Sequence, residues 1–308
     1  MRALITGISG FVGSHLAHRL YSAGWQVSGF DLHPASVSIG DFHQGELTDH
    51  AAVKRALEAT KPDVIFHLAG IIKSTDAEFL YRANLMGTVA LLDQVIESGL
   101  RPTVVVASSS AVYGHRSGAK PISERMPRHP VTHYAVSKVA QEAAALRYYE
   151  SFHLPVKVVR MFNLLGPGQS ASLACSAFAH QIALAEAGGE NKIATGNLDA
   201  RRDFVDVRDA ARAFILTAEK GTSGQVYNVC SGRAVSIQKC LDIMLAMSSQ
   251  RIETWIDAAR VHKHDVPIQI GNFQKIKKIT GWTPKITLKQ SLADLLNDWR
   301  QRVKSELE

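Results

Sequence analysis

The chain has few cysteines and lacks a long apolar run. Its three cysteines, Cys175, Cys230 and Cys240, form neither an even disulfide set nor a metal-ligand spacing. Such a small number is typical of a reducing compartment, and we expect a cytoplasmic location. The histidines are scattered along the chain, and no metal site is expected. No apolar run approaches a membrane span and no basic-then-apolar leader is recognisable, so no membrane association is expected.

The chain also lacks a basic run, although its formal net charge is +7. Without such a run, or a basic stripe interleaved with aromatics, nucleic acid is not an expected partner. The positive charge would equally attract an anionic nucleotide-sugar. Internal repeats and low-complexity linkers are missing as well. A chain of 308 residues can bury one large α/β core and a smaller one.

A glycine triplet follows the first apolar run of the sequence. Residues 2–6 are typical of a buried strand, the turn Gly7-x-x-Gly10-x-x-Gly13 comes next, and an amphipathic helix is expected from residue 14. Strand, glycine turn and helix start are the context of a dinucleotide-binding loop. Gly7 allows the tight turn, Gly10 lets the backbone approach a pyrophosphate, and Gly13 lets helix and strand pack closely. The helix N-terminus then faces the phosphates.

A second apolar run, 25–30, ends in an acidic residue, Asp31. A carboxylate at this place accepts a hydrogen bond from a ribose 2′-hydroxyl and repels a 2′-phosphate. Asp31 therefore favours NAD over NADP. The plainer alternative is that Asp31 caps the turn at the strand end.

Apolar strands alternate with helical patterns over the first 163 residues. Further strands are expected near 42–44, 63–69, 103–107 and 156–160, and helices over 51–60, 78–98 and 134–152. This alternation predicts an α/β fold with a doubly wound parallel sheet of the Rossmann type.

The pattern is looser beyond this point. Residues 1–163 are interpreted as a dinucleotide-binding domain and 164–308 mainly as a smaller C-terminal α/β substrate-binding domain, with some later segments returning to the first. Helices are expected over 173–187, 206–219, 236–247 and 287–302, and a strand over 225–229.

A tyrosine and a lysine four residues apart, Tyr134 and Lys138, share one face of the last helix of the first domain. An ammonium beside a phenol favours the phenolate, so Lys138 is expected to lower the pKa of Tyr134 toward neutrality. A hydroxyl from elsewhere, at Ser109, would then polarise a substrate oxygen. The trio indicates proton transfer at an alcohol or carbonyl. A solvated helix face and a plain strand-end turn are the alternatives.

Seven motifs occur in a fixed order over nearly the whole chain. They are Gly7-x-x-Gly10-x-x-Gly13, His67-Leu-Ala-Gly70, Asn84-Leu-Met-Gly-Thr88, Ser108-Ser-Ser-Ala-Val-Tyr-Gly114, Tyr134-x-x-x-Lys138, Arg160-Met-Phe-Asn163 and Arg202-Asp-Phe-Val-Asp206. Each is weak alone, but together they are specific. With them the chain resembles the extended short-chain dehydrogenase/reductase family, which comprises nucleotide-sugar epimerases, dehydratases and reductases.

The resemblance implies catalytic roles for four residues. Tyr134 is the acid/base, Lys138 its electrostatic partner and a ligand of the nicotinamide ribose, and Ser109 contacts the substrate oxygen. Asn84 falls at the position of a helix residue that supports the proton relay, with a capping or turn amide as the alternative. The resemblance implies cofactor contacts at Gly7, Gly10, Phe11, Val12, Gly13, Asp31, Glu46, Leu47, Leu68, Ala69, Gly70, Lys73, Tyr134 and Lys138.

Some of these positions carry open alternatives. Glu46 heads an adenine-contact pair that usually begins with Asp in the family. Lys73 is implied to reach the phosphates of the cofactor, or else is an ordinary surface lysine. Asp206 is interpreted as a helix N-cap rather than a catalyst. His67 is interpreted as a satisfied polar group near the sheet end.

The second half of the chain is most similar to the GDP-4-keto-6-deoxymannose reductases. That similarity lies in residues 162–169, 195–206, 226–232 and 280–284. It implies that Asn163 binds near the substrate diphosphate and that Arg202 clamps it, unless Arg202 is an ion-pair partner of Asp203 or Asp206. Where relatives carry a second arginine, this chain has His262 with Arg260 nearby. Substrate contacts are implied for Ser110, Asn163, Gln169, Gln181, Arg202 and Arg260.

These residues predict a nucleotide-sugar oxidoreductase that acts at sugar C4 with NAD, and a GDP-4-keto-6-deoxymannose reductase in particular. An NAD-dependent 4-epimerase is the first alternative, and a dinucleotide-binding sensor without turnover is the second. A dehydratase is disfavoured because Ser110 and Ala111 stand where that activity has an acidic pair. A homodimer formed through helices 78–98 and 134–152 is expected from the family alone.

Overall fold

The computed structural model describes residues 1–34, 40–115, 120–260 and 266–308. Within these ranges seven parallel strands form one sheet, in the order β10-β6-β5-β4-β1-β2-β3. The predicted doubly wound parallel sheet is confirmed. The strands are β1 Arg2–Thr6, β2 Gln26–Asp31, β3 Phe42–Gln44, β4 Val64–His67, β5 Thr103–Ser109, β6 Val156–Met161 and β10 Val226–Val229.

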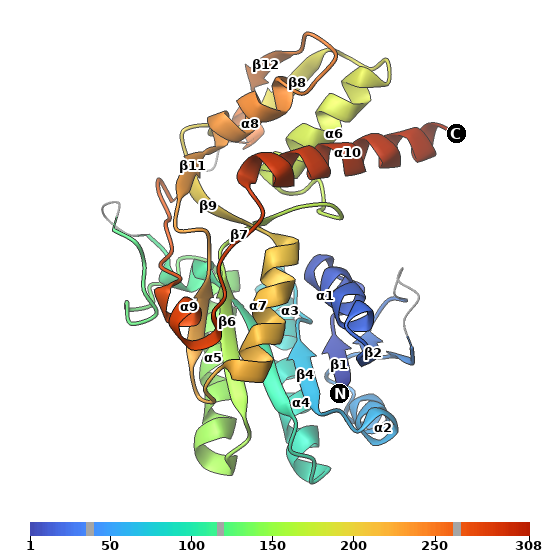
Figure 1. Ribbon diagram of the computed structural model, residues 1–308, viewed down its shortest axis with the longest axis vertical. Coiled ribbons are helices and arrows are strands. Elements are labelled where there is room, and N and C mark those ends of the chain that lie inside the picture. The colour runs from blue at the N-terminus through green and yellow to red at the C-terminus, as the bar shows by residue number, and fades with distance from the viewer. Residues whose placement is uncertain (35–39, 116–119, 261–265) are drawn as a thin grey trace.

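Helices cover both faces of this sheet (Figure 1). Leu16, Phe214 and Trp282 are buried in the core on one face, and Leu57 and Leu92 in the core on the other. Because the central strands are covered on both sides, they consist of consecutive apolar residues. The first face carries α1 Phe11–Ser22, α7 Val207–Lys220 and α9 Gln274–Thr280, and the second carries α2 His50–Thr60, α4 Gly87–Glu97 and α5 His133–Phe152.

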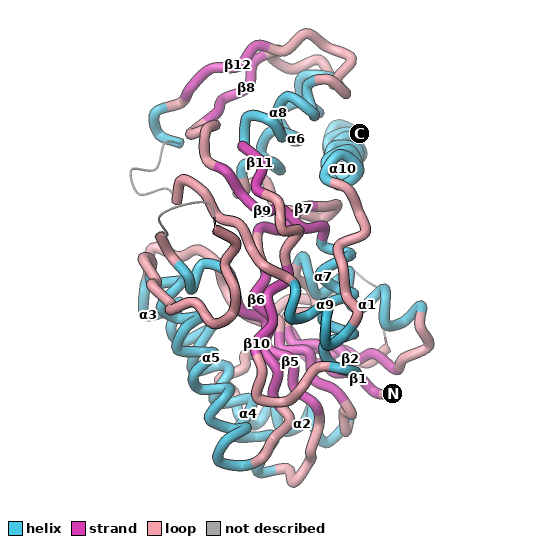
Figure 2. The backbone as a smooth tube through the Cα atoms, turned by 60° about the vertical axis from the view of Figure 1, so that its left-hand side comes forward, coloured by secondary structure: helices cyan, strands magenta, loops and turns pink. Residues whose placement is uncertain are grey.

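A smaller region lies beyond the carboxyl ends of the large sheet (Figures 1 and 2). It contains a three-stranded sheet in the order β11-β9-β7 and a strand pair β12-β8. Three helices pack around a core of their own, with Phe178, Leu241 and Leu295 buried in it. The elements are β7 Asn163–Leu165, α6 Ala174–Glu186, β8 Lys192–Thr195, β9 Arg201–Asp206, β11 Ala234–Ser236, α8 Ile237–Leu245, β12 Glu253–Ile256 and α10 Leu288–Leu307.

The helix predicted over 78–98 is broken into three parts. They are α3 Ala77–Tyr81, a π-helical turn η1 Arg82–Met86, and α4. Helix 206–219 begins as expected, because the Asp206 carboxylate accepts from Arg208 N and caps it. Short 3₁₀ turns lie at η2 Ser110–Tyr113 and η3 Ala258–Arg260. In the part of the chain that the structure describes, none of the helices has the length and apolar character to cross a membrane.

Candidate active site

The glycine loop packs against the loop that follows β4. A Cβ on Gly7, whose φ is +76°, would lie 2.5 Å from Ala69 N. A Cβ on Gly13 would lie 2.2 Å from Gly7 O, so only glycine lets α1 approach the loop so closely. Gly10 is the N-cap residue of α1. Because it has no side chain to accept from the first-turn N–H groups, those groups can bind an anion. This loop fits the diphosphate of a dinucleotide.

Asp31 binds the glycine loop through its carboxylate. Oδ2 accepts from Ser9 N at 2.9 Å, and Oδ1 accepts from Leu32 N at 2.7 Å. Asp31 therefore does cap the turn at the strand end, as the alternative interpretation held. Carboxylate oxygens each accept more than one hydrogen bond, so capping does not prevent Asp31 from also accepting from a ribose hydroxyl.

Tyr134 lies in the first turn of α5, which Thr132 caps by accepting from Ala135 N at 3.1 Å. Ser109, the last residue of β5, hydrogen bonds to the Tyr134 side chain. The structure thus brings this hydroxyl and this phenol together. Ser109 Oγ also accepts from Ala111 N at 3.2 Å, which fixes it at the start of the 3₁₀ turn.

The expected lowering of the Tyr134 pKa is wrong for this structure. Burial raises the pKa of the phenol above its usual value, and the hydrogen bond from Ser109 opposes that rise only in part. The Lys138 ammonium does not counter this rise, because it is directed elsewhere. It donates to Ala107 O at 2.9 Å and to Gln141 Oε1 at 2.8 Å. Burial lowers the pKa of Lys138 to about 8, against an opposing effect of Glu142.

Asn84 holds the loop after β4 with both ends of its side chain. Oδ1 accepts from Ile71 N at 2.8 Å, and Nδ2 donates to Ile71 O at 2.9 Å and to Ser137 Oγ at 2.9 Å. A Cβ on Gly70 would lie 2.6 Å from Asn84 Oδ1 and 3.5 Å from Lys138 Nζ. Asn84 therefore joins the predicted cofactor loop to α5. The π-helical turn places the buried side chain there.

A buried ion pair lies behind Ser109, Tyr134 and Lys138. Arg160 on β6 donates to both carboxylate oxygens of Glu142, at 2.7 Å each. Ser108 Oγ donates to Glu142 Oε1 at 2.5 Å, and Arg160 Nη1 donates to Tyr113 Oη at 2.8 Å. The network fixes the end of β5 relative to α5, and so fixes Ser109 relative to Tyr134.

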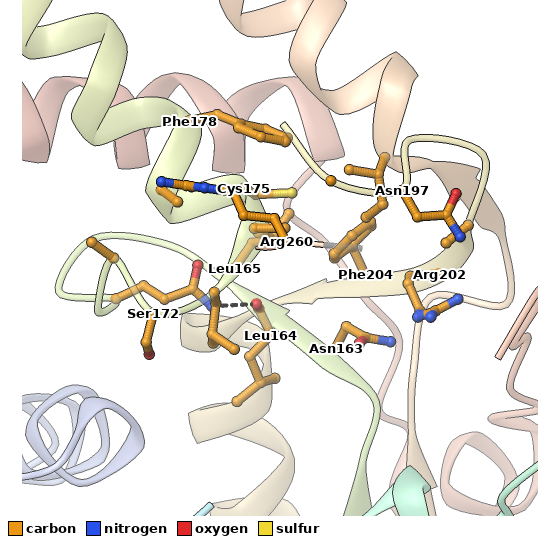
Figure 3. A pocket seen from close by; sticks show the side chains of 18 of the residues that line it. Asn163, Leu164, Leu165, Ser172, Cys175, Phe178, Asn197, Arg202, Phe204 and Arg260 are labelled. Carbon is orange, nitrogen blue, oxygen red and sulfur yellow. Dashed lines mark hydrogen bonds between the residues drawn. The ribbon is translucent and has the colours of Figure 1, made fainter. Parts of the chain in front are cut away.

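A cavity of about 490 Å³ lies between the end of the large sheet and the smaller region. Figure 3 shows Asn163, Asn197 and Arg202 on one side of it, and Ser172 and Cys175 on the other. Neither Tyr134 nor Ser109 belongs to the described residues that line it. The two sites are adjacent all the same, because Met161 pairs with Ser109 in the sheet and Asn163 follows two residues later.

Three cationic side chains line this cavity, Lys73, Arg202 and Arg260. Arg202 donates to Arg201 O at 3.1 Å and to Val266 O. Arg260 pairs with Asp257 at 3.3 Å. Lys73, implied as a ligand of the cofactor phosphates, thus lies on the wall of this cavity. His262 lies outside the described residues.

The acidic residues offered as alternative partners of Arg202 are engaged elsewhere. Asp203 accepts from Ser231 Oγ at 2.6 Å and from Gly271 N at 2.9 Å. Asp206 pairs with Arg208 at 2.8 Å.

Two predicted substrate residues are held by the protein itself. Gln181 accepts from Ala194 N at 2.9 Å and donates to Ala177 O at 3.0 Å, so it fastens α6 to β8 and does not line the cavity. Ser110 is buried and donates to Gln269 Oε1 at 3.0 Å. Ligand contacts at Gln181 and Ser110 therefore stay predictions, made by side chains that already hold the protein together.

Gln169 lines the cavity in a different way. It is 2% exposed, and its Nε2 donates to Leu164 O at 2.6 Å. Among the described residues its Oε1 has no hydrogen-bond partner. Since the bonded carbonyl can only accept, the orientation of the amide is fixed, and Oε1 is a buried acceptor behind the cavity wall.

The remaining predicted cofactor residues surround the glycine loop and the β4 loop. Glu46 forms an ion pair with Arg82 at 3.3 Å. Leu47 is buried and packs against Gly87, where an added Cβ would lie 3.1 Å from the Leu47 Cβ. Leu68 N donates to Thr6 O at 3.0 Å. Phe11 and Val12 begin α1, and the Phe11 ring lies edge-on to His15.

The interpretation of His67 as a satisfied buried group is confirmed. Its Nδ1 contacts Thr6 Oγ1 and its Nε2 contacts Thr88 Oγ1, each at 2.7 Å. Over the residues that the structure covers, no three His, Cys, Asp or Glu side chains gather to hold a metal ion.

Sequence reasoning missed Gln141, Gln269 and Ser172. Gln141 lies three residues after Lys138, one helical turn along the same face, and this spacing could have pointed to it. Gln269 meets Ser110 from a distant part of the chain, and Ser172 lines the cavity beside residues remote in sequence, so the sequence carries no local signal for either.

Comparison with known proteins gives one consistent result. Residues 4–295 match the family model described as GDP-mannose 4,6 dehydratase. A GDP-6-deoxy-D-mannose reductase of Pseudomonas aeruginosa is 34% identical over 99% of both chains. The structure of RMD from Pseudomonas aeruginosa, complexed with NADPH, is 33% identical, with a TM-score of 0.88 over 98% of this chain and 100% of that one. A Thermus thermophilus UDP-glucose 4-epimerase complex with NAD is 25% identical, with a TM-score of 0.86 over 97% and 99%.

Proposed function

The chain belongs to the GDP-mannose 4,6-dehydratase family of extended short-chain dehydrogenase/reductases, and from this premise we propose that it is a nucleotide-sugar reductase. The substrate is a nucleoside diphosphate 4-keto sugar, and GDP-4-keto-6-deoxymannose is the best candidate. The observation that carries the proposal is the hydrogen-bonded pair Ser109 and Tyr134 at the sheet edge. Lys138 lies one turn further along α5, and the cationic cavity is adjacent.

The residues have separate tasks in a reduction. A bound nicotinamide cofactor supplies the hydride that becomes attached to sugar C4. The Ser109 hydroxyl donates a hydrogen bond to the sugar carbonyl oxygen, which makes C4 more electrophilic. Tyr134 then delivers its phenolic proton to that oxygen as the alcohol forms. The Lys138 ammonium points to Ala107 O and Gln141 Oε1 and not to the phenol, so its proposed task is to hold the cofactor ribose with its remaining N–H.

The cavity provides for the nucleoside diphosphate. Arg202 and Arg260 present planar guanidinium groups that bind phosphate oxygens in pairs, and Lys73 adds a third cation. Asn163 donates to Asp203 O at 3.4 Å and lines the same wall, next to the sheet edge. This order of groups would place the diphosphate in the cavity and the sugar toward Tyr134.

The cofactor is nicotinamide-based, and we propose NAD as the preferred form. Asp31 supports this choice, since a carboxylate at the end of β2 repels a 2′-phosphate. The Pseudomonas aeruginosa RMD structure holds NADPH, so the preference must be measured for this chain.

An NAD-dependent 4-epimerase is the competing function. The Thermus thermophilus structure is an epimerase with NAD, and Asp31 suits an enzyme that keeps NAD bound through two half-reactions. A dehydratase is disfavoured, although the family model is named for that activity. Ser110 and Ala111 occupy the places where a dehydratase has its acidic pair, and Ser110 is bound to Gln269.

The assembly and location follow the same reasoning. We propose a cytoplasmic homodimer that joins through α3, η1 and α5. Phe79, Met86 and Val136 support this face, because they are 46%, 50% and 38% exposed on those elements. Residues 1–163 would form the dinucleotide-binding domain and 164–308 mainly the substrate-binding domain.

The experiment is a comparison of two assays on the purified protein. In the first, GDP-4-keto-6-deoxymannose is mixed with NADH or NADPH, and the absorbance of the reduced cofactor and the product mass are followed. In the second, UDP-glucose is added without cofactor and its conversion to the C4 epimer is followed. The NAD that the protein releases on denaturation is quantified separately. A reductase consumes one reduced cofactor per product in the first assay. Stoichiometric bound NAD and turnover only in the second assay would establish the epimerase instead.

A further inference from the structure

A row of buried polar side chains runs from the glycine loop to the catalytic lysine. Thr6 ends β1, His67 ends β4, Thr88 lies on α4, and Gln141 and Lys138 lie on α5. The first four are completely buried, and Lys138 is 6% exposed. Because these groups are shielded from water, each must satisfy its hydrogen bonds inside the protein.

The contacts along the row are short and continuous. Thr6 Oγ1 and His67 Nδ1 are 2.7 Å apart, as are His67 Nε2 and Thr88 Oγ1. Gln141 Nε2 donates to Thr88 Oγ1 at 2.8 Å, and Gln141 Oε1 accepts from Lys138 Nζ at 2.8 Å. The lysine is therefore joined, through the three side chains of Gln141, Thr88 and His67, to Thr6, which precedes Gly7.

The direction of each hydrogen bond follows from Thr88. Its hydroxyl proton is given to Asn84 O at 2.7 Å, so Thr88 Oγ1 only accepts from its other partners. His67 must then donate from Nε2, and its Nδ1 must accept from Thr6. Gln141 must likewise present its amide nitrogen to Thr88. A rotated amide would set N–H groups against the ammonium, and Thr88 would have no proton to offer the oxygen.

We propose that Gln141 is a positioning residue whose amide oxygen is held toward the Lys138 ammonium by the directional hydrogen-bond row of Thr88, His67 and Thr6. With Ala107 O, this oxygen takes two of the three N–H donors of Lys138. The third remains for a ligand on the side of Gly70. Gln141 thus sets both where the ammonium points and how strongly its charged form is favoured. The inference rests on the proposed function only in assigning Lys138 a catalytic task.

The charged groups near Lys138 support this reading. Glu142 on the same helix raises the pKa of Lys138, and Tyr134 precedes it by one turn. Arg160 on β6 neutralises Glu142. Burial, and secondarily the Lys138 charge, lower the pKa of His67 to about 3, so His67 stays neutral in the working range. Of the groups that contact the ammonium directly, Gln141 and Ala107 supply only neutral oxygen.

The experiment measures the titration of Lys138 directly. Protein labelled with ¹⁵N at lysine Nζ is titrated by NMR, and the Lys138 resonance is assigned by its loss in Lys138→Met. The variants are Gln141→Leu, Gln141→Glu and Thr88→Val. Gln94→Leu is the matched control, because Gln94 is a buried glutamine on α4 that bonds to Glu97 and His50, away from the site.

The proposal predicts opposite shifts for the two Gln141 variants. Gln141→Leu removes an acceptor from a charged donor, so the Lys138 midpoint falls from about 8 by roughly one pH unit. Gln141→Glu places a carboxylate there, and the midpoint rises. Thr88→Val releases the amide and shifts the midpoint in the same direction as Gln141→Leu, by less. Gln94→Leu leaves it unchanged.

Reductase activity provides the second readout. Reduction needs Lys138 charged, so the alkaline limb of the turnover profile moves with the NMR midpoint in every variant. An unmoved midpoint in both Gln141 variants would overturn the positioning role. A shifted midpoint in a protein that reduces no nucleotide-sugar would instead refute the proposed function and leave the role of Gln141 standing.

Discussion

The substitution Asn84→Ala separates a loop clamp from a proton relay. The family resemblance assigns Asn84 to the relay, whereas its side chain binds both backbone groups of Ile71 and the hydroxyl of Ser137. Alanine removes all three hydrogen bonds and keeps the backbone carbonyl that accepts from Thr88. The substitution therefore loosens the loop after β4 and leaves the buried row of side chains in place.

The expected magnitude follows from the lost contacts. Three hydrogen bonds at about 1 kcal/mol each give a loss of about 3 kcal/mol in the free energy of unfolding. For a chain of this size, that corresponds to a fall in Tm of about 5 °C. Because Gly70 packs on Asn84, the KM for the cofactor should rise about tenfold, which is equivalent to about 1.4 kcal/mol of binding energy.

Thermal unfolding and steady-state kinetics check these values, with turnover and the cofactor KM determined separately. Asn191→Ala, at an exposed position of the smaller region, is the control and should match the wild type. If turnover instead fell about a hundredfold or more while Tm and the cofactor KM stayed unchanged, Asn84 would not be a loop clamp. Its assignment to the proton relay would then stand.

Three further substitutions test other parts of the site. Gly13→Ala puts a Cβ 2.2 Å from Gly7 O and should abolish cofactor binding in calorimetric titrations, so wild-type affinity would contradict the close-packing argument. Glu142→Gln leaves Arg160 as a buried unpaired charge and should cost about 3–5 kcal/mol in urea unfolding. It should also lower the midpoint of the alkaline limb of turnover below about 8, because Glu142 raises the pKa of Lys138. Asp31→Ala should raise the ratio of kcat/KM for NADPH over NADH by about tenfold or more, and an unchanged ratio would reduce Asp31 to a turn cap.

The sequence predicts the large sheet well because its signals are local. Buried parallel strands are continuous apolar runs, and the glycine turn between β1 and α1 has a steric cause that glycine alone satisfies. The N-cap role of Asp206 follows in the same way from one carboxylate before a helix. These features need no knowledge of distant contacts.

The failures of sequence reasoning involve distant partners. The π-helical turn Arg82–Met86 interrupts the predicted helix and puts Asn84 against Ile71. The hydrophobic periodicity of residues 78–98 does not predict this interruption. The contacts of Gln181 are also distant in sequence, because β8 lies beside it and bonds both ends of its amide.

The pKa of Tyr134 shows the same limit in electrostatic terms. Helical spacing correctly puts Lys138 on the neighbouring turn, but spacing does not reveal how deeply the phenol is buried or where the ammonium points. Burial raises the pKa of Tyr134, and Gln141 and Ala107 hold the ammonium. These quantities depend on packing between α5, β4 and β5, which only the folded structure specifies.

The central claim is that Tyr134 transfers the proton at sugar C4, and Tyr134→Phe tests it most directly. The variant keeps the ring and removes only the hydroxyl that bonds to Ser109. We predict that turnover in the reduction of the 4-keto sugar nucleotide falls by about 10²–10⁴-fold, while the cofactor dissociation constant stays within a factor of about three of wild type. Retained turnover in Tyr134→Phe, with cofactor still bound, would contradict the assignment of Tyr134 as the acid.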